Sequence, residues 1–202
     1  YAGLPGRHLW LTAILAPRFL ASAFASGPAL LILLCLIVRR ISKFDPGREA
    51  IQKLSIIVIY AMIISLFFIV LEFFTAYYSG IPSHAAGLQY LYFGYEGHRP
   101  LVPWMWGSAI LAVAAIAVLF NPGLRRHEGI LAVACGMVFL STWIDKGLGL
   151  VMGGFAITPM ETVVDYAPTL PEILITIGIY GIGALVITLL YKIAVGVKES
   201  LA

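Results

Sequence analysis

The sequence has little charge for its length. Of its 202 residues only 11% are Asp, Glu, Lys or Arg, whereas 61% are hydrophobic. Soluble domains carry about 25% charged residues, so this composition excludes a soluble globular protein. The formal net charge of +3 is too small to indicate a partner such as nucleic acid.

Cysteine and histidine, the usual ligands of redox cofactors, are also scarce. Cys35 and Cys135 lie within apolar stretches and form no C-x-x-C pair, so neither a disulfide framework nor a bound iron–sulfur cluster is expected. A transmembrane haem needs axial ligands that project from helix interiors, and the histidines do not offer them, so no bound haem is expected. All four fall in loops or at the ends of apolar stretches: His8, His84, His98 and His127. No metal-ligand cluster, nucleotide-binding loop or nucleophile–base pair is recognisable, and no residue is predicted to be catalytic.

Long apolar runs, in contrast, recur along the whole chain. A helix needs about 20 mostly apolar residues to cross the hydrocarbon core of a bilayer, and only intrahelical hydrogen bonds satisfy its backbone there. The sequence therefore predicts an all-α protein, a single polytopic bundle of about five transmembrane helices embedded in a lipid bilayer. The spans are expected at about residues 16–38, 54–78, 102–120, 129–151 and 171–195.

The distribution of positive charge predicts the orientation of the bundle. Most of the thirteen lysines and arginines fall on one side of the membrane: Arg39, Arg40, Lys43, Arg48, Lys53, Arg125, Arg126, Lys192 and Lys198. The other side has Arg7, Arg18, Arg99 and Lys146. Because cytoplasmic loops carry the excess of Lys and Arg, the C-terminus is predicted to be cytoplasmic. The two longest connections, about 79–101 and 152–170, then lie on the outer face.

A few ionisable residues interrupt the apolar spans and are the candidate functional residues. Such residues are costly in lipid and usually face a bundle interior or a cavity. Glu72 lies in the second span, about six residues before its outer end, and Asp145 and Lys146 lie in the outer third of the fourth. Arg18 opens the first span and Glu172 opens the fifth. By the predicted topology, all five belong to the outward half of the bundle.

Two interpretations of this group stay open. In one, buried carboxylates exchange protons, either on a proton path or at the polar wall of a quinone pocket. In the other, ion pairs lock the helices together and no proton moves. His84, in an outer connection after Pro82, is a further candidate for proton handling, because histidine changes charge near neutral pH.

Several runs of residues carry a resemblance to a known family. They include Arg7-x-x-Trp10, Ala16-Pro17-Arg18-Phe19, Glu72-Phe73-Phe74-Thr75-Ala76-Tyr77-Tyr78, Tyr90-x-x-x-Gly94, and Trp143-Ile144-Asp145-Lys146-Gly147 with its continuation through Thr158-Pro159 to Asp165-Tyr166-Ala167-Pro168 and Glu172-Ile173. Together they resemble the polysulfide reductase membrane subunit family, also called NrfD-like, and especially its larger DsrP and HmcC type members.

The resemblance implies a multi-pass subunit of a respiratory complex in the cytoplasmic (inner) membrane of a prokaryote. Such subunits bind no redox cofactor of their own and exchange electrons between menaquinol or menaquinone and a ferredoxin-like iron–sulfur subunit, often alongside a multihaem cytochrome c. Family members are considerably longer, so the chain is expected to be the C-terminal half of a longer protein. The family's better-attested quinone site lies in the other half, so the resemblance assigns no quinone ligand here and leaves Glu72, Asp145, Lys146 and Glu172 as proton-conducting or structural residues.

Two other functions stay open beside this quinone-linked one. A secondary transporter or proton channel would fit Glu72 and the glycine-interrupted helices, but it predicts a paired polar site near the bilayer midplane. A cofactor-free membrane anchor for redox subunits predicts that acid-to-amide changes weaken assembly and spare turnover.

Overall fold

The computed structural model describes residues 4, 7–41, 47–158, 160, 162–164 and 167–200. Lys43 of the charge distribution and Pro159, Asp165 and Tyr166 of the motifs lie outside these residues. The chain divides into two compact units, Tyr1–Asp165 and Tyr166–Ala202. Each unit is described by itself.

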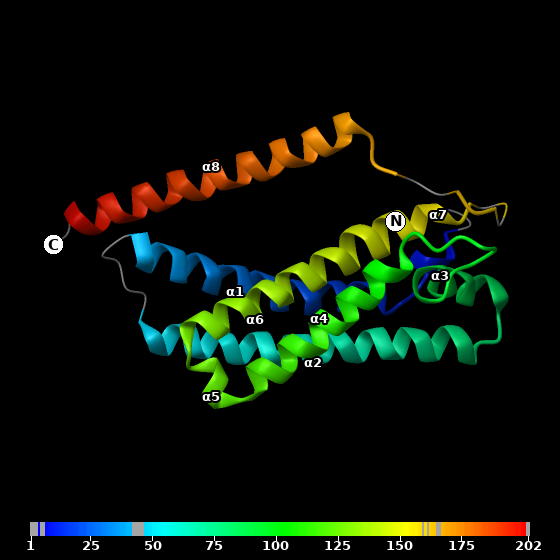
Figure 1. Ribbon diagram of the computed structural model, residues 1–202, viewed down its shortest axis with the longest axis horizontal. Helices are drawn as coiled ribbons and strands as arrows, with labels where there is room; N and C mark the ends of the chain where they lie inside the picture. The colour runs from blue at the N-terminus through cyan, green and yellow to red at the C-terminus, as the bar shows by residue number, and fades with distance from the viewer. Residues whose placement is uncertain are drawn as a thin grey trace. The chain divides into compact units, whose positions relative to one another are not determined.

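The first unit is a bundle of four long helices (Figure 1). They are α1 (Leu15–Ile41), α2 (Arg48–Tyr78), α4 (Val102–Phe120) and α6 (Glu128–Trp143). Helix α1 packs along α2 and α6, and α6 packs along α4, whereas the neighbouring helices α2 and α4 pack more loosely than these pairs. Small side chains such as Ala29, Ala115 and Ala134 are fully buried between the helices, which allows the backbones to approach closely.

Shorter elements connect and extend these helices. A 3₁₀ turn, η1 (His8–Trp10), precedes α1, and α3 (Pro82–Tyr92) follows α2. The four-residue α5 (Pro122–Arg125) links α4 to α6. Helix α6 continues directly into a π-helix, η2 (Ile144–Met152), and one further turn, α7 (Gly153–Ala156). The second unit contains the single long helix α8 (Leu170–Ser200).

The predicted all-α class and the five spans are confirmed. Five helices of the described residues are long and apolar enough to cross a membrane, at Leu15–Arg40, Arg48–Tyr78, Val102–Phe120, Glu128–Ala156 and Leu170–Ile193. The second begins before the predicted residue 54, because the helix continues through a polar turn in which Lys53 Nζ lies 2.7 Å from Glu49 Oε1. The fourth extends beyond residue 151 through η2 and α7. That all five form one bundle, and that the C-terminus is cytoplasmic, stay predictions.

The segment before α1 holds the C-terminal end of the continuous helical stretch formed by α6, η2 and α7. Arg7 Nη1 donates to the carbonyl oxygens of Gly154, Phe155 and Ile157 at 3.2, 2.9 and 2.6 Å. These carbonyls lie where a helix end leaves acceptors without intrahelical donors. The fully buried Trp10 donates from Nε1 to the carbonyl of Leu150 at 2.8 Å. The arginine and the indole thus fix η2 and α7 against the start of α1.

Gly154 provides the space for the Trp10 ring. A Cβ atom at this position would overlap the indole, so Gly154→Ala should destabilise the protein by about 1–3 kcal/mol, the usual cost of overpacking. Gly136→Ala is the matched control, because a Cβ at Gly136 in α6 meets nothing within 4 Å. Thermal unfolding in detergent should show a lower midpoint for Gly154→Ala alone, and equal midpoints would contradict the tight contact.

Candidate functional site

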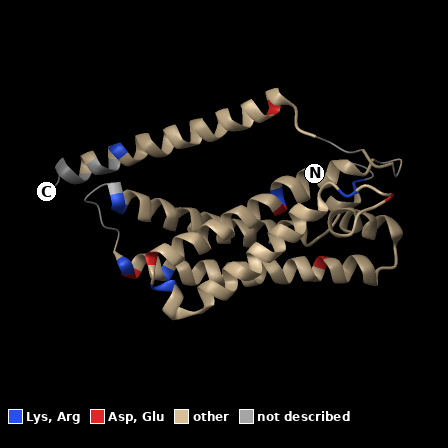
Figure 2. Cartoon of the chain, in the orientation of Figure 1, with Lys and Arg blue, Asp and Glu red and all other residues tan. Residues whose placement is uncertain are grey.

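Charged residues are confined to a few places in the first unit. Figure 2 shows that Lys, Arg, Asp and Glu gather at the end of the bundle where α1 ends and α2 begins. The described middle parts of α1, α2, α4 and α6 carry almost no charge. The exceptions lie toward the opposite end, on α1, α2 and η2, and they form the candidate site.

Arg18 of α1 lies between two carboxylates from other helices. Its Nη1 donates to Glu72 Oε2 of α2, and its Nη2 donates to Asp145 Oδ1 of η2 at 2.5 Å. Lys146 completes the group, with Nζ 3.1 Å from Asp145 Oδ2. The four side chains of this buried cluster therefore contain two positive and two negative charges.

The buried cluster is almost completely removed from solvent. Arg18, Glu72 and Asp145 are each only 5% exposed. Taking a charged side chain out of water costs several kcal/mol, and opposite partners with good hydrogen-bond geometry offset this cost. The alternation of charge from Glu72 through Arg18 and Asp145 to Lys146 supplies such partners, so the buried charges are tolerated as long as they balance.

The π-helix positions two members of the buried cluster. Asp145 and Lys146 are the second and third residues of η2, where the backbone widens from α-helical to π-helical hydrogen bonding. Such π segments are rare and occur mostly at functional sites. Lys146 extends to the face of Phe19, with Nζ 4.7 Å from the ring centroid, a cation–π contact that partly replaces water around the ammonium.

A cavity of about 260 Å³ adjoins Glu72 on the side of the buried cluster toward η1 and α3. We call it the histidine cavity, because His8 and His84 line it together with Glu72, Thr75 and Leu88. The two imidazole rings lie 5.6 Å apart between centroids. The cavity thus brings His84, a predicted candidate, to the same space as Glu72.

A second cavity, of about 270 Å³, lies between the loosely packed helices α2 and α4. We call it the lateral cavity. Its wall includes Asp145 and the hydroxyl residues Ser65 and Thr142, with Trp106 on its rim. Because Val70 and Trp106 are 61% and 48% exposed, the lateral cavity opens on the outer surface of the bundle.

Tyr92 of α3 lies between the lateral cavity and the buried cluster. Burial raises the pKa of its phenol above the ordinary value, and the negative charges of Asp145 and Glu72 raise it further, against the effect of Arg18. The hydroxyl therefore keeps its proton and can donate a hydrogen bond to a carbonyl oxygen in the lateral cavity.

The buried cluster separates the two cavities. The space left beside Arg18, Glu72 and Asp145 is about 10 Å³, at the lower limit of about 10–15 Å³ for a single water. Glu72 lines only the histidine cavity of the two, and Asp145 lines only the lateral cavity. The buried cluster and this water-sized space therefore lie between the two cavities.

Of the five charged residues predicted for the outward half, the structure brings four together. Arg18, Glu72, Asp145 and Lys146 form the buried cluster, as the matched levels of the spans suggested. Glu172 belongs to the second unit, and its Oε2 accepts hydrogen bonds from Thr169 N and Oγ1 at 2.7 and 2.8 Å. This capping box stabilises the start of α8, a local role that the sequence analysis did not assign.

Sequence reasoning missed the contributions of Tyr92 and His8. The sequence places Tyr92 in an outer connection and His8 in a loop or at the end of an apolar stretch. The spacing Tyr90-x-x-x-Gly94 gave no sign that Tyr92 would face inward. The π-helix was also missed. The glycines around Asp145 and Lys146 indicate close backbone approach, which does not distinguish a π-helix from an α-helix.

Comparison with known proteins agrees with the motifs of the sequence. A family model described as "Polysulphide reductase, NrfD" matches residues 1–159. The chain belongs to the NrfD family. It is also similar to a putative dimethyl sulfoxide reductase membrane subunit of Halobacterium salinarum, with 24% identity over 213 residues that cover 93% of this chain and 46% of the relative. The chain thus spans about half the length of the curated relative it matches.

The NrfD match contains the whole buried cluster and ends before α8. It therefore covers both the histidine cavity and the lateral cavity. The predicted family is confirmed, whereas the prediction that the chain corresponds to the C-terminal half of a longer NrfD protein stays a prediction.

The charge balance of this NrfD cluster can be tested by removing its charges singly and in pairs. Arg18→Gln leaves two buried carboxylates facing one ammonium, so it should destabilise the protein by about 3–5 kcal/mol. The double variant Arg18→Gln/Glu72→Gln leaves the neutral Asp145–Lys146 pair and should recover most of the loss. Thermal unfolding in detergent measures both. A double variant no more stable than Arg18→Gln would contradict the balanced network.

Proposed function

We propose that the chain is part of an integral membrane subunit of a quinone-linked respiratory oxidoreductase complex. The subunit exchanges electrons between menaquinol or menaquinone and an iron–sulfur partner subunit, and its buried cluster transfers the protons. The NrfD family match supports the family-level part of this proposal. The name of the relative, a reductase membrane subunit, supports a role beside a catalytic partner.

One observation carries the proposal: a single arginine joins two carboxylates that face different cavities. Asp145 faces the lateral cavity, which opens between α2 and α4 at the surface of the bundle. Glu72 faces the histidine cavity. A group that entered the lateral cavity from the bilayer would meet Asp145. Arg18 connects this carboxylate to Glu72, which lines the other cavity.

The lateral cavity suits a quinone headgroup. Ligand pockets are mostly apolar with a few placed polar groups, and here Phe73 and Trp106 supply apolar wall while Tyr92 and Asp145 supply a donor and an acceptor. As a bound quinol becomes a quinone, its electrons pass one at a time to the iron–sulfur partner. Its two hydroxyl protons pass to Asp145 one after the other. Because Arg18 keeps its own proton, each proton crosses to Glu72 through the water-sized space beside Arg18 and leaves by the histidine cavity. Quinone reduction follows the same steps in reverse.

The membrane-anchor function remains the competing proposal, and the charge balance of the buried cluster favours it. A neutral ion-pair network can join α1, α2 and η2 without moving a proton. The two proposals differ in what they predict for the removal of a carboxylate that leaves the helices assembled.

Glu72→Gln provides this distinction, because the amide keeps the shape of the side chain and cannot carry the proton. We expect quinol-dependent turnover of the assembled complex to fall about a hundredfold, the scale of a lost proton-transfer group. Glu49→Gln is the matched control, since Glu49 lies on the same helix, exposed and paired with Lys53. Wild-type turnover by an assembled Glu72→Gln complex would remove Glu72 from the proton path and favour the anchor.

Filling the lateral cavity tests the quinone site itself. Ala109 of α4 lines this cavity, so Ala109→Phe should raise the KM for quinol about tenfold by occupying the space of the headgroup. Ala117→Phe, at an exposed position of the same helix, should leave the KM unchanged. Equal KM values for both variants would place the quinone elsewhere, without affecting the conclusion from Glu72→Gln.

A further inference from the structure

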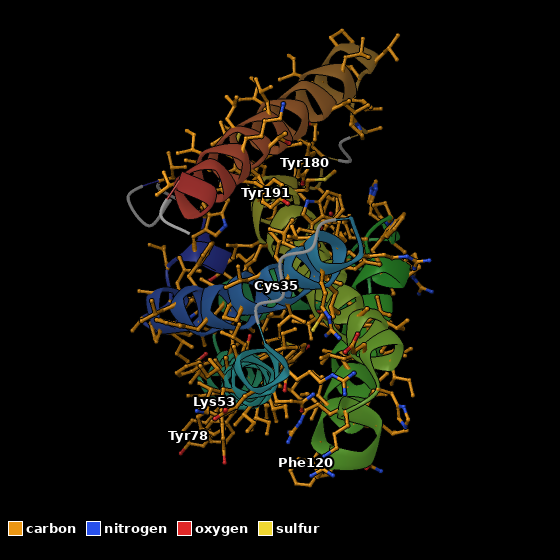
Figure 3. All side chains as sticks on the ribbon, turned by 90° about the vertical axis from the view of Figure 1, so that its left-hand side faces the viewer. Cys35, Lys53, Tyr78, Phe120, Tyr180 and Tyr191 are labelled. Atoms are coloured by element: carbon orange, nitrogen blue, oxygen red, sulfur yellow. The ribbon has the colours of Figure 1, made fainter. Side chains whose placement is uncertain are left out.

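Arginines dominate the other end of the first unit. Arg39 and Arg40 end α1, Arg48 begins α2, and Arg125 and Arg126 lie between α4 and α6. Figure 3 views the molecule from this end, with Lys53 labelled on α2 and Phe120 at the end of α4. Among the described residues here, Glu128 is the carboxylate nearest these arginines, with Oε1 2.7 Å from Arg39 Nη1 and 3.5 Å from Arg48 Nε. Positive charge is in excess at the level where the spans end.

A cavity of about 350 Å³ lies at this end, between α1 and α6. It is lined by Leu36, Arg39, Arg40, Glu128, Gly129 and Ala132. The small residues of α6 leave the room, and the two arginines of α1 supply the charge. We call this space the arginine cavity. Leu36 lies one turn deeper in the apolar span than Arg39 and Arg40, so the cavity runs from a charged mouth to an apolar wall.

We propose that the arginine cavity binds the headgroup of an anionic phospholipid. The phosphate would lie against Arg40, and the start of the acyl chains against Leu36 and Ala132. Basic pockets between transmembrane helices are the usual sites for anionic headgroups. This role is separate from the redox chemistry, because the buried cluster lies toward the opposite end of the same helices.

Two features favour a lipid over a free anion or an acidic protein segment. The cavity lies where the spans Leu15–Arg40 and Glu128–Ala156 meet the membrane surface, which is the level of lipid headgroups. Its apolar wall would contribute nothing to a small hydrophilic anion. Glu128 already occupies the side of Arg39 that a protein carboxylate would seek, whereas Arg40 is exposed and lies at the headgroup level.

Charge reversal at Arg40 tests the proposal in the native complex. Arg40→Glu should weaken the binding of phosphatidylglycerol about 30-fold, about fivefold for each unit of charge. Lys53→Glu is the matched control, because it makes the same change at the same end and Lys53 does not line the arginine cavity. Lipid retained by the gently purified complex is quantified by mass spectrometry. The delipidated complex is then titrated with phosphatidylglycerol, phosphatidylcholine or inorganic phosphate while thermal unfolding is followed.

The expected result is retention and stabilisation by phosphatidylglycerol in the wild type and in Lys53→Glu, and their loss in Arg40→Glu. Equal losses in both variants would show general attraction to an anionic surface and overturn the site. Equal stabilisation by phosphatidylcholine, or by inorganic phosphate alone, would overturn an anionic lipid as the ligand. Release of a partner subunit from Arg40→Glu, with no lipid bound to the wild type, would identify the cavity as a protein-docking site instead.

Discussion

The bridge that Arg18 forms between Glu72 and Asp145 is the interaction on which this end of the bundle depends. An arginine fork can hold two carboxylates in fixed directions, which a lysine cannot do. Since each carboxylate comes from a different helix, α1, α2 and η2 must present Arg18, Glu72 and Asp145 at the same depth. A shift of any helix along its axis would leave a charge buried alone, at a cost of several kcal/mol. The buried cluster therefore sets the relative height of these helices.

The same balance governs how the buried cluster would respond to a proton. With two positive and two negative groups it is neutral at rest. A proton that arrives at Asp145 gives it a net positive charge, which a weakly polarisable interior disfavours. Departure of the proton from either carboxylate restores neutrality, and the two carboxylates face different cavities. The ion-pair network that stabilises the fold is thus also suited to proton transfer. The membrane-anchor function and the proton-path function therefore rest on the same buried cluster.

Sequence reasoning predicted the parts of this structure that depend on one-dimensional pattern. Apolar length predicted the spans, and the positions of charges within them predicted that Arg18, Glu72, Asp145 and Lys146 would share a level. The pairing among them, the separation of Glu172 into its own capping box and the inward position of Tyr92 depend on side-chain directions between helices. Cavities depend on the same information, because the lateral cavity exists only where α2 and α4 pack loosely.

The two ends of the first unit use charge in opposite ways. The buried cluster is neutral and removed from water, so it contributes little to the interaction of the bundle with the field of the membrane surface. The arginines at the other end are in excess and lie where the candidate membrane spans end, and near an anionic leaflet a basic residue contributes about 1 kcal/mol. The predicted orientation and the proposed lipid contact therefore rest on residues such as Arg40 that do not touch the cluster. Substitutions there can alter membrane placement while Arg18 and its two carboxylates keep their geometry.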